Sequence, residues 1–336
     1  MNAFNIFISI IPVFVFLIAL VFIDTYKLTG IKKILIAVFA GMVSALFSMG
    51  INRFLLSNGS MEFTAYSRYV SPGIEEFFKA VFIFYMIKSY RIGFMVDGAV
   101  LGFAAGAGFA VIENIYYLSR LENNDFFLWT VRGFGTAMMH GGTTAIFAVI
   151  SKMWFDKNVS GKFFVFIPGI VLAIGIHSLF NHFLVPPHIL TIFQLLLLPL
   201  FLVIIFNISE KILCDWLEEG LDGDVQMLDY ISSGNFSETK TGKYLHSLKS
   251  GFRSLIIGDM LCYLRIHLEL SIRAKGILLM KANGFPVLFD DEINEKLAEL
   301  DFLGKSIGKA GKLALSPILH RSNHDVWQLS LLADNN

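Results

Sequence analysis

The clearest structural signal in the chain is the run GFMVDGAVLGFAAGAGFAVIENIYYL, residues 93–118. It exceeds the roughly 20 mostly apolar residues that an α-helix needs to cross the hydrocarbon core of a bilayer. Gly98, Gly102 and Gly106 recur every four residues and therefore share one face of the helix. Such a face of small residues predicts close packing against a second membrane helix. Asp97, near one end of the run, is expected to cap the helix or to lie at an interface.

Six further apolar runs of similar character flank this one along the chain. Hydrophobic residues make up 55% of the 336 residues and charged residues only 16%, whereas soluble domains carry about 25% charged residues. The first run lacks the basic leader and small-residue cleavage site of a signal peptide, so we expect a retained helix. The sequence therefore predicts an all-α, polytopic transmembrane bundle of about seven helices. The six other windows are residues 4–23, 34–56, 72–89, 131–151, 163–184 and 189–207.

Lysine and arginine in the short loops predict the orientation of the bundle, because such residues concentrate on the cytoplasmic side. The second and fourth loops contribute only Arg68 and Arg120, and the sixth contributes none. We therefore expect a cell-membrane protein with its N-terminus outside and its C-terminal region in the cytoplasm. The basic residues of the first, third and fifth loops are Lys27, Lys32, Lys33, Lys88, Arg91, Lys152, Lys157 and Lys162.

The composition changes after about residue 207, where charged and polar residues appear every few positions. This change predicts a transmembrane domain at 1–207 and a soluble, mostly helical domain at 208–336. The soluble domain shows no nucleotide or metal motif, so a regulatory or docking role is expected. The formal net charge of zero gives no indication of nucleic-acid binding. Mixed polar and apolar spacing suggests amphipathic helices at 243–275 and 290–304.

The third apolar window opens with an unusual polar cluster, SPGIEEFFK. Ser71 suits the N-cap of a helix and Pro72 its first turn. Glu75 and Glu76 then lie at the positive end of the helix dipole, which favours carboxylates. Lys79 is four residues after Glu75 and three after Glu76, so it can pair with either of them. One carboxylate can thus be neutralised while the other stays available as a base.

Three further windows carry polar groups that are costly inside a membrane and are functional candidates for that reason. They are Glu113 and Asn114 in the fourth window, His140 in the fifth, and His177 with Asn181 in the sixth. A single membrane histidine often only bonds two helices together. With the expected topology, however, all of these groups lie within about 15 Å of the external surface, at a rise of 1.5 Å per residue. Their common depth predicts one shared site.

This combination resembles the PrsW family of intramembrane proteases, part of a wider group that contains the CAAX prenyl endopeptidases and bacterial Abi-type membrane proteins. The matching segments are EEFFK from Glu75, FAVIEN ending at Asn114, the segment around His140, and HSLFN from His177. The resemblance covers roughly residues 70–185.

The chain departs from the CAAX endopeptidase pattern in two places. That pattern has a longer EExxxR spacing, and its second motif ends in histidine where this chain has Glu113. The departure favours the PrsW branch over prenylated substrates. It leaves open whether His140 replaces the missing histidine.

The resemblance implies hydrolysis of a peptide bond in a membrane-protein substrate, of the kind represented by anti-sigma factors. It implies Glu75 as the carboxylate that activates water, with support from Glu76 and Lys79. It further implies that His177 and Asn181 bind the water or the oxyanion. The residue chemistry agrees, because amide hydrolysis needs an activated water, a proton donor and an oxyanion donor.

Two questions stay open at the level of sequence. His140, His177 and Glu75 could supply the three protein ligands of one catalytic zinc ion, but the chain has no HExxH motif and the residues favour metal-free, carboxylate-based catalysis. Buried Glu, Asn and His are also found in transporters, usually near the midplane with duplicated halves. A non-catalytic scaffold or receptor that acts through its cytoplasmic domain is the remaining alternative.

Overall fold

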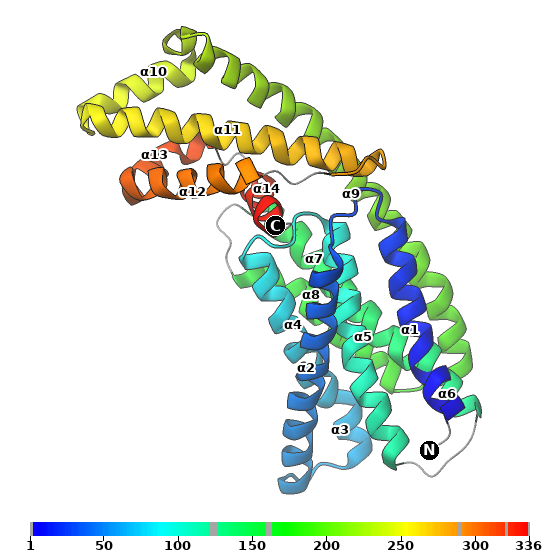
Figure 1. Cartoon of the computed structure of the whole chain (residues 1–336). Coiled ribbons are helices and arrows are strands. Elements are labelled where there is room, and N and C mark those ends of the chain that lie inside the picture. The colour runs from blue at the N-terminus through cyan, green and yellow to red at the C-terminus, as the bar shows by residue number, and fades with distance from the viewer. Residues whose placement is uncertain (1–2, 121–125, 159–162, 288–290, 320–321, 335–336) are drawn as a thin grey trace. The chain divides into compact units, whose positions relative to one another are not determined.

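The structure is a computed structural model that describes residues 3–120, 126–158, 163–287, 291–319 and 322–334. Within these residues the chain forms helices and no strand. It divides into two compact units, Met1–Glu210 and Lys211–Asn336. Figure 1 shows the helices of both units, which are described separately below.

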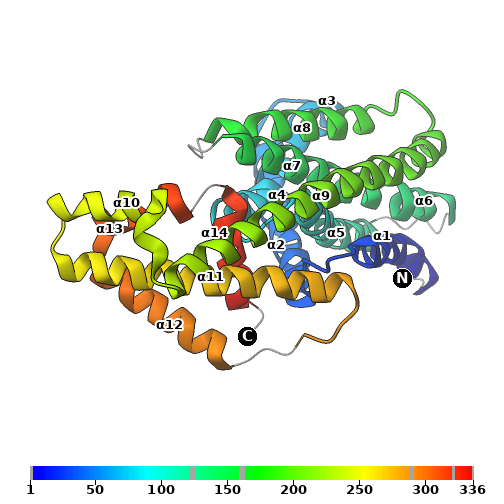
Figure 2. The ribbon, with the colours of Figure 1, turned by 90° about the horizontal axis from the view of Figure 1, so that it is seen from above.

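All seven apolar windows are helical in the first unit. Helix α5 lies at its centre and packs against α1, α2, α4 and α7 (Figure 2). The last helix, α9, continues beyond this unit into the second. The elements are α1 (Ala3–Ile23), α2 (Ile31–Asn58), α3 (Phe63–Tyr69), α4 (Ser71–Lys88), α5 (Met95–Arg120), α6 (Phe126–Val131), the π-helix η1 (Arg132–Thr136), α7 (Ala137–Lys157), η2 (Phe163–Phe166), α8 (Ile167–Asn181) and α9 (Pro187–Ser232).

Five helices in the described part of the chain are long and apolar enough to cross a membrane: α1, α2, α5, α8 with η2, and α9. Helix α4 falls short because four of its 18 residues are charged. Helix α7 falls short because its mean hydropathy is lowered by His140, two glycines and two threonines in its first two turns and by Lys152 further along. The all-α membrane bundle is therefore confirmed, whereas the number of seven crossings is not.

The glycine face of α5 packs against α7, as predicted. A Cβ atom at Gly102 would lie 2.6 Å from the carbonyl oxygen of Thr144, and one at Gly106 would overlap the carbonyl oxygen of His140. Gly98 lies on the same side and has more space. Only glycine permits this approach of two backbones. The close packing places the first turn of α7 directly against α5, one to two turns before the polar end of α5.

Asp97 is a capping and interface residue, as expected. Its Oδ2 accepts hydrogen bonds from the backbone N–H groups of Gly93 (2.9 Å) and Phe94 (3.3 Å), which precede α5. Its Oδ1 accepts a hydrogen bond of 3.0 Å from the hydroxyl of Thr29, in the segment between α1 and α2. The side chain thus fixes the start of the central helix to the first connection of the bundle.

The second unit is a bundle around α11, with apolar clusters on two of its faces. Met260, Leu264 and Leu315 belong to one cluster, and Leu270 and Leu332 to the other. The amphipathic segment expected at 243–275 is divided, because the chain turns at Leu248–Ser250 before α11 begins. Besides the end of α9, the elements are η3 (Asn235–Glu238), α10 (Lys240–Ser247), η4 (Leu248–Ser250), α11 (Ser254–Ala282), α12 (Asp291–Ser306), α13 (Gly308–Leu319) and α14 (Asn323–Asp334).

Candidate functional site

Glu76 is the most heavily bonded group of the candidate site. The Nζ atom of Lys79 lies 2.5 Å from its Oε1, and both side chains are almost fully buried. The same oxygen is 2.8 Å from Nδ1 of His177 and accepts a hydrogen bond of 3.1 Å from the hydroxyl of Thr143. Lys79 thus pairs with Glu76 and not with Glu75. The sequence predicts that one of the two carboxylates is neutralised in this way.

Glu75 has one oxygen fixed and one oxygen directed at an imidazole. Its Oε1 accepts hydrogen bonds from the hydroxyl of Ser71 (2.6 Å) and the amide of Asn52 (3.3 Å). The hydroxyl of Tyr66 donates to the Asn52 carbonyl oxygen at 2.9 Å. The Oε2 atom lies 3.7 Å from Nε2 of His177. Ser71 was expected to be an N-cap; instead it is the first residue of α4, and its hydroxyl orients the carboxylate one turn later.

A second branch of the network runs through His140 and Glu113. Nδ1 of His140 lies 3.1 Å from the ammonium of Lys79, and its Nε2 lies 3.0 Å from Oε2 of Glu113. A lysine ammonium can only donate, so Nδ1 accepts and Nε2 carries the hydrogen that is donated to Glu113. The guanidinium of Arg132 lies 3.3 Å from the same carboxylate oxygen. The rings of His140 and His177 are 4.9 Å apart, so both branches meet in one place.

The structure leaves the two candidate amides outside this cluster. The Asn114 amide donates a 2.7 Å hydrogen bond to the carbonyl oxygen of Ser9 in α1, and its own oxygen accepts a 2.9 Å bond from Arg132. The Asn181 amide donates a 3.0 Å bond to the carbonyl oxygen of Ser67 in α3. These side chains join helices, and the direction of the Asn181 amide differs from the expected contact with water or an oxyanion.

Several residues that contact the cluster were not predicted from the sequence. Arg132 carried a usable signal, since it is a charged side chain at the start of an apolar window. It also begins the π-helix η1, and π turns often occur at functional sites. Asn52 and Thr143 had no such signal, because an uncharged polar residue in an apolar helix is common, and Tyr66 lies between two of the apolar windows.

The charges of the site do not balance. Three carboxylates, Glu75, Glu76 and Glu113, face two permanent cations, Lys79 and Arg132, which leaves one negative charge while the histidines are neutral. An unbalanced charge is costly in a buried setting. The site therefore has room for one additional positive charge, either a proton or part of the charge of a metal ion.

The residues fit a single metal ion in most respects. One ligand atom each from Glu75, His140 and His177 lie within 4.8 Å of one another, and ligands of a tetrahedral zinc ion are about 3.3 Å apart. The bond from Nδ1 of His177 to Glu76 leaves Nε2 free to coordinate, an arrangement typical of metal-binding histidines. His140 would offer Nε2 to the ion with its ring hydrogen moved to Nδ1, which requires the Lys79 ammonium to turn away from Nδ1.

Comparison with known proteins adds one finding. A family model described as "PrsW family intramembrane metalloprotease" matches residues 29–207, more than half of the chain. This range contains the whole cluster and ends before the second unit, which begins at Lys211. Searches of curated proteins and of solved structures returned no match.

Proposed function

The chain belongs to the PrsW family of intramembrane metalloproteases, and we propose that it cleaves its substrate with a water molecule activated by Glu75. Family membership makes it a membrane-bound peptidase whose substrate is a membrane protein. One observation carries the assignment of Glu75: its Oε1 is held by Ser71 and Asn52, while its Oε2 faces His177 in a cluster of buried polar groups.

The proposed reaction uses groups that the fold already holds in place. Glu75 takes a proton from the attacking water and later delivers it to the leaving amine nitrogen, so no external acid is needed. His177 is oriented by Glu76 and presents Nε2 to the same space. The Nε2 hydrogen of His140 can turn from Glu113 to the developing oxyanion. Arg132 and Lys79 hold nearby positive charge without leaving their partners.

The most direct test replaces the base without changing its shape. In Glu75→Gln the amide cannot accept the proton of water, so the cleavage rate of a single-pass membrane substrate should fall by about a thousandfold or more. His177→Ala should be similarly inactive. Glu62→Gln, at an exposed carboxylate just before α3, is the matched control and should cleave normally. A Glu75→Gln protein that inserts normally and cleaves at the wild-type rate would contradict the proposal.

We propose, as the alternative form of this site, that Glu75, His140 and His177 hold the metal ion indicated by the family description, in which case Glu75 and His140 serve as ligands and not as base and oxyanion donor. A bound zinc ion supplies a water of pKa about 7 and polarises a carbonyl group. Chelator treatment should therefore abolish cleavage, and added zinc should restore it. Elemental analysis should find about one ion per chain in the wild type and none in His177→Ala. Full cleavage by metal-free protein would instead support the carboxylate-only mechanism that the sequence favours.

The remaining parts of the proposal concern the setting of the reaction. The distribution of lysine and arginine supports an outer-face site, an external N-terminus and a cytoplasmic C-terminal domain in the cell membrane. Residues 1–207 would form the protease and residues 208–336 an accessory or regulatory domain. A single-pass membrane protein of the anti-sigma-factor kind fits such a site, because its membrane segment would present a peptide bond near the outer face.

A further inference from the structure

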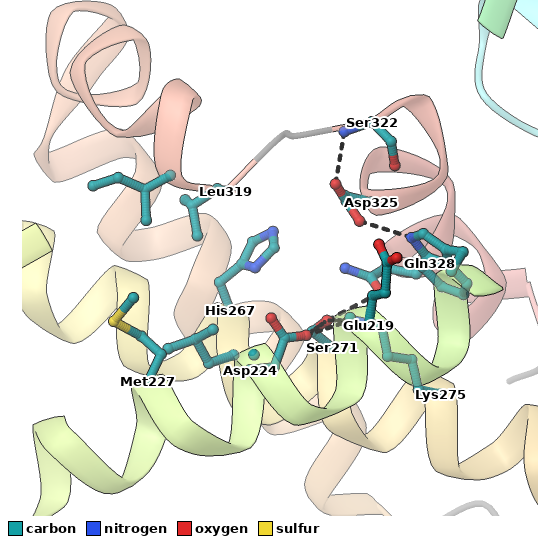
Figure 3. A pocket seen from close by; sticks show the side chains of 15 residues that line it. Glu219, Asp224, Met227, His267, Ser271, Lys275, Leu319, Ser322, Asp325 and Gln328 are labelled. Carbon is teal, nitrogen blue, oxygen red and sulfur yellow. Dashed lines mark hydrogen bonds and ion pairs between the residues drawn. The ribbon is translucent and has the colours of Figure 1, made fainter.

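The second unit contains a cavity that the family match does not reach. Its volume is about 200 Å³, which corresponds to roughly six or seven water molecules at liquid density. Side chains from α9, α11, α13 and α14 line it (Figure 3). One part of the wall is apolar and includes Met227, Leu268 and Leu319, whereas the rest is polar. The cavity therefore suits a small molecule with one polar and one apolar end.

The polar wall contains more acidic groups than its single lysine neutralises. Asp224 accepts a 2.5 Å hydrogen bond from the ammonium of Lys275. The charge of Lys275 is therefore neutralised by Asp224. Asp325 accepts hydrogen bonds from the indole of Trp216 (3.0 Å) and from a backbone N–H group. Glu219 adds a third carboxylate to the lining. With a neutral imidazole at His267, which also lines the cavity, three carboxylates against one ammonium leave two negative charges, so a cation is favoured as the occupant and an anion is disfavoured.

A buried amide also faces this space. Gln328 is only 2% exposed, and its Oε1 lies 3.0 Å from the hydroxyl of Ser271. Its Nε2 has no hydrogen-bond partner within the described part of the chain, and Figure 3 shows the side chain directed at the cavity. Ser271 has one hydroxyl hydrogen and a stronger acceptor in Asp224, at 2.5 Å. The amide of Gln328 can therefore rotate and offer its oxygen to a donor in the cavity.

Two glycines of α9 contribute to the same wall for different reasons. A Cβ atom at Gly220 would lie 2.9 Å from the end of Lys275, so this glycine makes room for the lysine. A Cβ atom at Gly223 would meet nothing within 4 Å, although this residue lines the cavity. Glycine inside a helix is destabilising relative to alanine. No neighbouring atom requires a glycine at position 223. The absence of a side chain there keeps the cavity open.

We propose that this cavity binds a small organic cation, a primary ammonium group attached to a short apolar body. The carboxylates of Glu219 and Asp224 accept hydrogen bonds from the ammonium group, and the carbonyl oxygen of Gln328 accepts a third. The apolar body packs against Met227 and Leu268. This site is separate from the peptidase cluster, and its test does not depend on cleavage.

The experiment uses the full-length protein in detergent and three probes of equal size and different charge. In isothermal titration calorimetry, n-butylammonium should bind saturably with one site per chain. Butanoate and 1-butanol should bind at least tenfold more weakly. Glu219→Gln should weaken n-butylammonium binding about tenfold, since it removes a charge-assisted hydrogen bond. Glu218→Gln, at the exposed neighbouring residue outside the lining, should bind like the wild type.

A second pair of variants tests the cavity itself. Gly223→Met should fill the space and abolish binding while the helix remains folded, because methionine favours helix more than glycine does. Gly258→Met, at an exposed helical glycine of α11 with nothing within 4 Å, is the control and should bind normally. Equal binding of the three probes, or unchanged binding in both Glu219→Gln and Gly223→Met, would overturn the proposal.

Discussion

The geometry of Glu75 depends on neutral side chains that no charge pattern indicates. Asn52 in α2 donates to both Ser71 (2.8 Å) and Glu75 (3.3 Å), and Tyr66 in α3 orients the Asn52 amide. These bonds hold one carboxylate oxygen and leave the other to act. Asn52 is therefore a positioning residue, whose effect reaches the reaction through Glu75.

Asn52→Ala should lower kcat about tenfold with little change in KM, because a misplaced base affects the chemical step more than substrate binding. Tyr66→Phe should change kcat in the same direction by a smaller factor. Asn58→Ala, at an exposed asparagine on the same helix, serves as the control. A change confined to KM, or no change in Asn52→Ala, would show that this network does not position the base.

Asp24, outside the helices, makes the stability of the bundle depend on pH. Burial, together with the nearby charge of Asp97, raises the pKa of Asp24 from 3.8 to about 6. The folded protein therefore binds a proton more tightly than the unfolded chain. Its free energy of unfolding should fall as pH rises from about 4 to 6 and level off above that range.

Asp24→Asn should remove much of this dependence and stabilise the protein at pH 7 by up to about 3 kcal/mol. The substituted amide oxygen can still accept the 2.8 Å hydrogen bond from the Leu28 N–H group. The measurement is the thermal unfolding midpoint in detergent between pH 4 and pH 8. Parallel pH profiles for the two proteins would mean that Asp24 ionises normally.

Residue types were easier to predict than residue partners. The sequence identifies Glu75, Glu113, His140 and His177 because ionisable groups in apolar helices are rare and costly. It does not show that Asn181 turns to a backbone carbonyl, since a residue's direction depends on the neighbouring helix as well as on its own.

At the scale of elements, the backbone contact between α5 and α7 sets the position of His140. Gly106→Ala should force these helices apart, because the added Cβ would overlap the carbonyl oxygen of His140. The expected cost is about 1–3 kcal/mol of stability, with reduced cleavage in the protein that remains folded. Gly175→Ala in α8, where a Cβ meets nothing within 4 Å, should be neutral or slightly stabilising. Equal unfolding midpoints for the two variants would contradict this packing role.

The sequence predicted this contact because glycines four residues apart share a helix face. The number of membrane crossings could not be predicted in the same way. Helices α4 and α7 bury their polar residues against other helices. These residues lower the mean hydropathy of both helices, whether or not the helices cross the membrane. The same polar residues that indicate the function therefore obscure the crossing count.

On the scale of the whole molecule, the orientation of the chain is testable with its two cysteines. Cys214 and Cys262 are both exposed in the second unit, and the sequence contains no others. If that unit is cytoplasmic, a membrane-impermeant maleimide should label them only after the cells are permeabilised. Labelling in intact cells would place the unit outside and invert the proposed topology.

The two units also differ in how much of each candidate site could be predicted from the sequence. The first unit carries ionisable residues in membrane helices, and the family match covers most of it. The second unit is a helical bundle whose sequence carries charged and polar residues every few positions, so no single polar residue stands out. Its acidic cavity becomes visible only when α9, α11 and α14 are assembled, because its lining comes from segments distant in sequence.

The most direct test of the central claim is mass spectrometry of a single-pass membrane substrate incubated in ¹⁸O-labelled water with wild-type or Glu75→Gln protein. The expected result is one new C-terminus, near the outer end of the substrate's membrane segment, that carries one ¹⁸O atom and forms only with the wild type. The same product formed at the same rate by Glu75→Gln would contradict a hydrolytic site built around this carboxylate.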